Sequence, residues 1–190
     1  MSALSTPCAD EGPQAGAPSL QGLPPILDAH TRLLVLGSFP SVASLRAQCY
    51  YAHPQNQFWK ILGALWGLPL VDMPYPERVA VLLARGLGVW DVYAACEREG
   101  SLDSAIRHAR LNDLAGLRLR CPALQAIAHN GGESFRHARH TRALGLPVLR
   151  LPSTSPANAS WSFERKLAAW REVLAQHGLL DVLPLPSPLP

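Results

Sequence analysis

The stretch Leu33-Leu34-Val35-Leu36-Gly37-Ser38-Phe39-Pro40-Ser41 joins an aliphatic run to a turn that carries glycine, proline and two hydroxyls. A short, continuous apolar run of this kind favours a strand that is buried on both faces of a parallel sheet. Three further runs share this character, at 88–92, 123–128 and 147–151. Helical patterns separate the runs, so we expect one α/β domain with a four-stranded parallel sheet and helices on both faces.

Helices are expected at 56–66, 77–85, 133–144 and 162–177, and Asn112 or Asp113 can cap another short helix before the third strand. In the segment 56–66, large apolar residues recur at helical spacing. Pro76 precedes the segment 77–85 and Gly86 follows it, which is the usual placement of these two residues at helix ends.

The two ends of the chain differ in composition from the middle. Residues 1–25 contain five prolines among small residues, which predicts a flexible N-terminal arm. Alternating prolines exclude a helix interior near the C-terminus and predict a Pro-rich tail over 181–190. The folded domain is therefore expected at 26–180, and a chain of 190 residues suits one domain.

Composition excludes several classes of protein. Apolar residues make up 48% and charged residues 16% of the chain, which is enough apolar material for a core. The chain lacks the continuous apolar run that a membrane-spanning helix needs. The first residues, MSALSTPCADEGPQ, carry acids where a signal peptide has a basic region. We therefore expect a cytoplasmic protein without a membrane partner, in which the cysteines are reduced thiols.

Positive charge is concentrated in one part of the chain. The net charge is only +3, but 104–150 holds eight arginines against Asp113 and Glu133. Arginine pairs with phosphate through a planar fork, so a phosphate-rich partner is one interpretation. An ordinary arginine-rich solvated surface is the other.

Ligands of parallel α/β sheets bind beyond the carboxyl ends of the strands, here the loops at 37–57, 91–103, 129–133 and 152–160. Gly37 lets a ligand approach the backbone, and amides in such a turn can face an anion. The turn matches neither the GxGxxG fingerprint nor a P-loop, and a tight structural turn is the alternative.

The run Tyr50-Tyr51-Ala52-His53-Pro54-Gln55-Asn56-Gln57-Phe58-Trp59-Lys60 places aromatic rings and amides ahead of the first expected helix. Aromatic faces can stack on a base, and amides can bond its edge or hold a water. Asn56 can also cap the helix, which is compatible with chemistry, and Trp59 is expected in the core.

The last loop, Leu151-Pro152-Ser153-Thr154-Ser155-Pro156-Ala157-Asn158, offers three hydroxyls and an amide after a strand. Such groups can hold phosphate, and the prolines favour a rigid loop. An ordinary turn leading to the next helix is the alternative.

In order, GSFPS (37–41), HPQNQFWK (53–60), AIAHNGG (126–132) and LPSTSPAN (151–158) resemble motifs of the uracil-DNA glycosylase superfamily. The match covers about residues 31–176 and is closest to the hypoxanthine-DNA (deoxyinosine) glycosylase branch. The second motif is also similar to the mismatch-specific uracil glycosylases. Phe39 and Leu151 stand where other branches place a catalytic Asp or Asn and a His, and both departures agree with the hypoxanthine branch.

The resemblance implies an enzyme that flips a deaminated base out of DNA and hydrolyses its N-glycosidic bond. A lyase step needs an amine nucleophile, and neither 37–41 nor 151–158 contains a lysine, so we expect a monofunctional enzyme. The partner that the resemblance implies is DNA with deaminated bases, and we expect a monomer without a cofactor. The four cysteines lack the spacing of an iron–sulfur site, and His137 and His140 lack further ligands for zinc, so we expect no metal.

Site residues follow from the same comparison and fall into three groups. We expect the Asn56 amide to position water or bond the departing base, and the backbone around Ser38 and Phe39 to support developing charge. Base contacts are assigned to Tyr51, Phe58, Asp91 and Asn130, and DNA contacts to Gly37, Ser41, Ser153, Ser155 and Asn158.

Two other interpretations stay open at this point. A non-catalytic α/β module that binds nucleotides or nucleic acid would share the sheet, the Gly37 turn and the arginines. A glycosylase with uracil as its main substrate would share the motifs. The preference among hypoxanthine, uracil and xanthine does not follow from the sequence.

Overall fold

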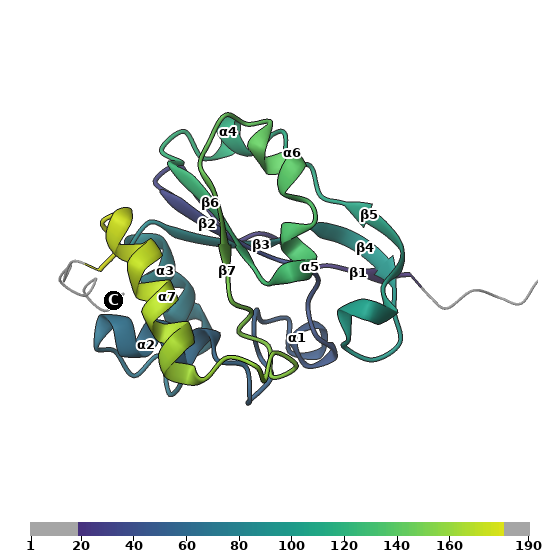
Figure 1. Ribbon diagram of the computed structural model, residues 1–190, viewed down its shortest axis with the longest axis horizontal. Helices are drawn as coiled ribbons and strands as arrows, with labels where there is room; N and C mark the ends of the chain where they lie inside the picture. Colours follow the sequence, from purple (N-terminus) through teal and green to yellow (C-terminus); the bar gives the residue numbers. More distant parts are fainter. Residues whose placement is uncertain (1–18, 181–190) are drawn as a thin grey trace, which may run out of the picture.

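The structure, a computed structural model, describes residues 19–180 and is built around a parallel sheet (Figure 1). Its strands are β2 (Leu33–Gly37), β3 (Leu87–Asp91), β6 (Ala126–Asn130) and β7 (Val148–Leu151). Their order is β3-β2-β6-β7, and all neighbouring pairs are parallel. The predicted four-stranded parallel sheet is confirmed.

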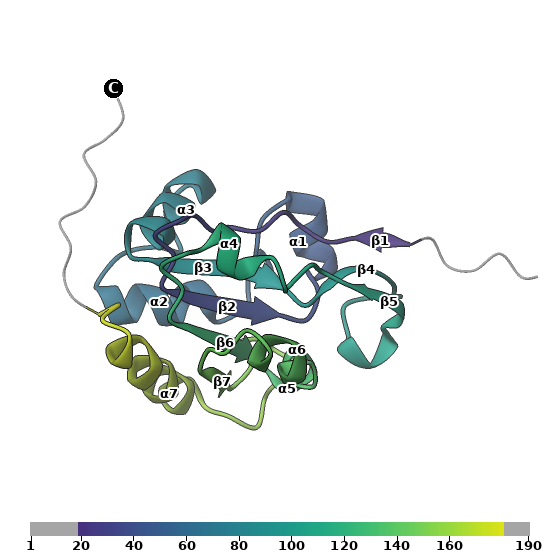
Figure 2. The ribbon, with the colours of Figure 1, turned by 90° about the horizontal axis from the view of Figure 1, so that it is seen from above.

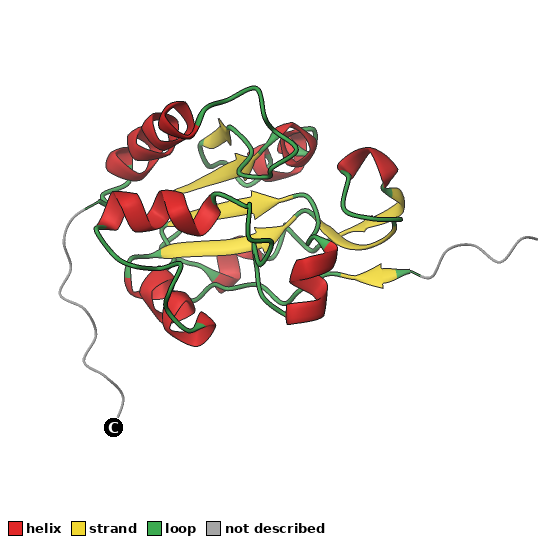
Figure 3. Cartoon of the chain, turned by 90° about the horizontal axis from the view of Figure 1, so that it is seen from below, coloured by secondary structure: helices red, strands yellow, loops and turns green. Residues whose placement is uncertain are grey.

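Helices cover both faces of this sheet. They are α1 (Val42–Ala47), α2 (Phe58–Trp66), α3 (Tyr75–Ala84), α4 (Leu117–Arg120), α5 (Gly132–Phe135), α6 (Ala138–Arg142) and α7 (Phe163–Gln176). In Figure 1, α4 and α6 lie above the sheet and α2 lies below it. Figure 3 shows the strands between helices on both sides.

The helix expected at 133–144 is broken into α5 and α6. His137 lies at the break, and its Nε2 lies 2.7 Å from the hydroxyl of Tyr93 on the adjoining sheet. The same hydroxyl donates to Glu133 Oε1 at 2.7 Å. The Tyr93 hydroxyl thus contacts α5 through Glu133 and the start of α6 through His137.

A second, antiparallel sheet was not predicted. It consists of β1 (Leu20–Gln21), β4 (Tyr93–Glu97) and β5 (Arg107–Leu111), in the order β1-β4-β5, and a short helix η1 (Asp103–Ala105) lies in the β4–β5 connection. Residues 91–103, expected as a loop, therefore include strand β4. Figure 2 shows this sheet beyond the carboxyl ends of the parallel strands.

The expected N-terminal arm is too long by several residues. Leu20 pairs with Cys96, Leu23 is buried, and Ile26 bridges to Val89, so residues 19–25 belong to the fold. Residues 1–18 and the predicted tail at 181–190 lie outside the described residues.

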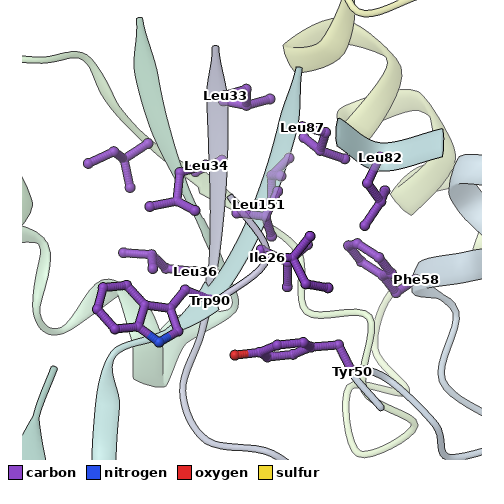
Figure 4. Packing of buried hydrophobic residues seen from close by; sticks show 14 of the residues in the cluster. Ile26, Leu33, Leu34, Leu36, Tyr50, Phe58, Leu82, Leu87, Trp90 and Leu151 are labelled. Carbon is purple, nitrogen blue, oxygen red and sulfur yellow. The ribbon is translucent and has the colours of Figure 1, made fainter. Parts of the chain in front are cut away.

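The core fills the space between the parallel sheet and its helices (Figure 4). The residues of β2 are fully buried, as their continuous apolar pattern predicts. Trp59 is also buried, as expected, and its indole donates to the carbonyl of Tyr50 at 3.0 Å. This packing holds the ends of the strands in fixed positions.

Candidate active site

A cleft of about 880 Å³ opens at the carboxyl ends of the parallel strands. The loops after β2, β6 and β7, the approach to α2 and the tip of the β4–β5 hairpin surround it. The sequence-predicted residues that line it are Gly37, Ser38, Phe39, Ser41, Tyr51, Asn56, Asp91, Asn130, Ser153, Ser155 and Asn158. Of the predicted set, Phe58 alone is absent from the lining.

Hydrogen bonds join the segment before α2 to the loop after β7, although these two motifs are far apart in the sequence. The amide of Gln57 donates to the carbonyl of Thr154 at 3.0 Å. The side chain of Asn130 donates to Thr154 Oγ1 at 2.9 Å and accepts from the Thr154 amide at 3.0 Å. Asn130 also donates to the hydroxyl of Tyr51 at 3.2 Å. These bonds engage its amide within the protein, so the expected base-reading role of Asn130 does not fit the geometry.

Asn56 lies at the start of α2, where the backbone still has free N–H groups. Its Oδ1 accepts from the amide of Phe58 at 3.0 Å, which fixes the orientation of the side-chain amide. The two N–H groups of Nδ2 are then available on the side chain that lines the cleft. The Asn56 side chain therefore bonds a backbone amide at the start of α2 and also lines the cleft.

Phe58 corrects another expectation, because its side chain is fully buried. Its ring stacks against Tyr51 with 4.0 Å between centroids and meets Trp170 edge-on. Phe58 thus supports the Tyr51 ring from behind and does not stack on a base. Tyr51 itself has a φ of 55°, an uncommon conformation for a residue with a side chain.

Asp91 forms the floor of the cleft at the end of β3. Its carboxyl is buried, and Oδ2 has no hydrogen-bond partner among the described residues. Burial and, to a lesser extent, the charge of Asp103 raise the pKa of Asp91 to about 8, while Arg98 opposes this shift. At neutral pH the carboxyl is therefore mostly protonated.

The position of the Asp91 carboxyl requires a glycine at residue 37. A Cβ at Gly37 would overlap Oδ1 of Asp91 and approach the hydroxyl of Tyr51. Only glycine allows the acid to lie against the end of β2, so the turn has a structural reason besides any role in binding.

The β4–β5 hairpin holds the loop that follows β2. Ser38 Oγ donates to Asp103 Oδ1 at 2.7 Å. The guanidinium of Arg98 lies 5.0 Å from the centroid of the Phe39 ring and donates to the carbonyl of Pro40. Sequence reasoning missed Asp103 and Arg98, because they lie in the unpredicted β4–β5 hairpin and their partners are about sixty residues away in the chain.

The loop after β7 is largely bonded to itself and to α7. Asn158 Nδ2 donates to the carbonyl of Ser153 at 3.1 Å, and the amide of Ser155 donates to Ser153 Oγ at 3.2 Å. Lys166 is buried, which lowers the pKa of its amine, and Nζ donates to the carbonyl of Asn158 at 3.0 Å. The loop is a preformed turn, and DNA contacts by its side chains stay a prediction.

Of the arginines in the positively charged segment 104–150, one lies at the cleft. Arg150 lines the cleft, and its guanidinium lies 5.7 Å from the ring centroid of Phe135. Arg142 lies over the same ring, and Arg136 pairs with Glu133 at 3.0 Å.

Residues 19–180 contain neither a metal-binding cluster nor a membrane-spanning helix. No group of three His, Cys, Asp or Glu side chains in that range is placed to hold a metal ion. None of the helices there is long and apolar enough to cross a membrane.

Comparison with known proteins agrees with this geometry. The sequence profile of the Uracil DNA glycosylase superfamily matches residues 24–175. The Hypoxanthine DNA glycosylase of Methanosarcina acetivorans is 39% identical over 153 residues, covering 80% of this chain and 96% of that protein. Its namesake from Methanosarcina barkeri is 36% identical over 152 residues, with the same coverage of each chain. A solution NMR structure from Methanosarcina acetivorans, described as a uracil DNA glycosylase, has a TM-score of 0.73 and 38% identity, covering 82% of this chain and 98% of that one.

Proposed function

The chain belongs to the uracil DNA glycosylase superfamily, and we propose that it removes hypoxanthine from deoxyinosine in DNA. The bond from C1′ to the purine nitrogen breaks, a water oxygen bonds C1′, and a water proton ends on the purine. One observation carries the proposal. The Asn56 amide and the buried Asp91 carboxyl line one cleft that the motif loops enclose. The names of the two curated relatives support hypoxanthine as the base.

Asp91 is suited to the base edge because a neutral carboxyl both donates and accepts. Hypoxanthine presents the O6 acceptor beside the N1–H donor, so the acid O–H can donate to O6 while its carbonyl accepts from N1–H. An ionised carboxylate would lose the first bond and repel charge that develops on the purine. A buried acid that stays protonated at pH 7 can serve as such a donor.

Asn56 is suited to the departing purine. The transition state is expected to resemble an oxocarbenium ion, with negative charge moving onto the base. With Oδ1 fixed on the Phe58 amide, Nδ2 can donate to the nitrogen side of the purine as the bond breaks. This geometry favours bonding to the base over activation of water by the amide oxygen.

A lyase step through an amine is not part of the proposal. Schiff-base chemistry needs a lysine nucleophile at the sugar. Lys166 is buried and donates to the carbonyl of Asn158, and Lys60 is exposed on α2. We therefore propose a monofunctional enzyme. We also propose a monomer that acts in the cytoplasm on chromosomal DNA.

A panel of lesions tests the substrate. Single- and double-stranded oligonucleotides that carry deoxyinosine, deoxyuridine or deoxyxanthosine are incubated with the protein, and abasic sites are then cleaved by alkali. We expect the fastest cleavage at deoxyinosine. Faster cleavage at deoxyuridine would favour the uracil enzyme, and no cleavage of any strand would favour a binding module.

DNA affinity is expected to fall with salt because binding releases counterions from phosphates. If α6 faces the duplex, Arg136→Ala/Arg139→Ala/Arg142→Ala should weaken binding to DNA of any sequence. The slope of log K against log[salt] should then become shallower by as much as about 3. Fluorescence anisotropy at several salt concentrations measures both quantities, with Arg171→Ala on α7 as the control. An unchanged slope in the triple variant would show that these arginines face away from DNA.

A further inference from the structure

Two carboxyl groups line the cleft, those of Asp91 and Asp103, and the described residues of the lining include no histidine or lysine. Asp91 is buried, whereas Asp103 is exposed to solvent on η1, in the β4–β5 connection. The proposed reaction uses the neutral Asp91 carboxyl at the base edge and leaves the attacking water without a partner. Asp103 is thus the remaining carboxyl in the lining that can accept a proton from this water.

The Asp103 carboxyl is held in place through one of its two oxygens. Oδ1 accepts from Ser38 Oγ at 2.7 Å, and Oδ2 accepts no hydrogen bond from any described residue. The chain beside it is also fixed, because Ser101 Oγ accepts from the amide of Val42 at 3.0 Å. A carboxylate can accept several hydrogen bonds, so Oδ2 is free to bond a water while Oδ1 keeps the group in position.

The place of Asp103 in the cleft suits the sugar of a flipped nucleotide. Such a nucleotide enters base first, and its sugar stays joined to the strand outside. With the purine against Asp91 at the floor, C1′ lies on the solvent side of the base. Asp103 lines the cleft on that side, where its exposed carboxyl meets entering water.

The surroundings of Asp103 favour proton transfer. Partial loss of water raises the pKa of the Asp103 carboxyl, and the hydrogen bond from Ser38 opposes this rise. Glu133 on α5 raises the pKa further, whereas Arg98 at the end of β4 lowers it. A raised pKa makes a carboxylate a stronger proton acceptor. Other titratable groups that interact with this carboxyl are Asp91 on β3 and Tyr93 and Cys96 on β4.

We propose that Asp103 is the general base that takes a proton from the water attacking C1′. This inference rests on the proposed function, because only hydrolysis at C1′ requires such a water. As the water oxygen bonds C1′, one water proton moves to Asp103 Oδ2, and the electron pair of the breaking bond leaves with the purine. The purine then takes a proton from solvent, and Asp103 releases its proton to solvent.

Asp103→Asn should lower the single-turnover rate of excision from deoxyinosine DNA on the order of 100-fold. The amide oxygen can still accept from Ser38, but it cannot take the water proton. The wild-type rate should fall as the pH drops from about 7 to about 4, because Asp103 is then protonated, and Asp103→Asn should lack this decline. Asp72→Asn, at an exposed acid outside the cleft, makes the same change of charge and should match the wild type at every pH.

Azide distinguishes a general base from a residue that only supports the loop after β2. It brings an electron pair to C1′ and has no proton to lose, so its attack needs no base. Azide should restore much of the excision by Asp103→Ala, and mass spectrometry should find azide bonded to C1′ in place of hydroxyl. Asn56→Ala, whose expected defect concerns the departing purine, should not be rescued. Ser38→Ala breaks the same hydrogen bond but keeps the carboxylate, so it should lose far less rate than Asp103→Asn.

Thermal unfolding establishes that each variant is folded before its rate is compared. Near-wild-type excision by Asp103→Asn, an equal loss in Ser38→Ala, or no rescue of Asp103→Ala by azide would overturn the general base and leave the proposed function intact. No excision by the wild type from any substrate would instead overturn the proposed function, and the general base with it.

Discussion

Asn56→Ala is expected to lower the single-turnover rate of hypoxanthine excision on the order of 100-fold, or about 3 kcal/mol of transition-state stabilisation. The variant loses the side-chain amide that lines the cleft, whereas the proposed DNA contacts of the other loops are unchanged. DNA affinity should therefore change little. Rapid-quench kinetics with excess enzyme measures the rate, and anisotropy measures the affinity.

The second role of Asn56 must be separated from the first. Loss of its bond to the Phe58 amide should lower the free energy of unfolding by about 1 kcal/mol. Ser162→Ala is a matched control, because it removes the cap of α7 at a residue that does not line the cleft. It should lose similar stability and keep its excision rate. A folded Asn56→Ala protein with near-wild-type excision would remove Asn56 from the chemistry.

Asn56→Asp distinguishes the two chemical roles. A carboxylate keeps the acceptor that bonds the Phe58 amide and can orient water, but it has no donor and repels an anionic purine. We expect it to be as inactive as Asn56→Ala. Retained excision in Asn56→Asp would assign Asn56 to water activation instead.

Excision is expected to decline as the pH rises through about 8, because Asp91 then ionises. Asp91→Asn should abolish this decline, since an amide donates and accepts like the neutral acid at every pH. Asp91→Ala should be slow throughout the range. Single-turnover rates between pH 6 and pH 10 measure the profiles, and a decline that persists unchanged in Asp91→Asn would contradict the assignment.

Asp91→Asn should also change how the free energy of unfolding depends on pH. The folded-state pKa of Asp91 lies above its ordinary value of 3.8, so folding favours the neutral acid. The wild type therefore loses stability relative to Asp91→Asn as the pH rises from about 4 to about 8, and the difference is constant above that range. Denaturant unfolding at several pH values checks this sign.

The parallel sheet could be predicted because β2, β3 and β6 are buried throughout and appear in the sequence as largely apolar runs, while the edge strand β7 is only partly buried. The second sheet could not be predicted in this way. Strand β5 exposes Arg107, His108 and Arg110 and carries no apolar alternation, while Leu20–Gln21 is too short to show a pattern.

The cleft could be predicted for a topological reason, since the carboxyl ends of parallel strands meet at one edge of the sheet. The role of each side chain in the cleft depends on contacts with residues that are far away in the sequence. Phe58 and Asn130 looked like ligand contacts and instead support Tyr51 and Thr154. The raised pKa of Asp91 depends on burial and on Asp103, which sequence spacing does not reveal.

We propose that this cleft releases free hypoxanthine from DNA by hydrolysis. The most direct measurement is mass spectrometry of the small-molecule and oligonucleotide products after incubation of the wild-type protein with a deoxyinosine strand. We expect free hypoxanthine and an equal amount of intact strand with an abasic site, which breaks only after alkali. Undamaged deoxyinosine strand with no free base, or strand cleavage without alkali, would contradict it.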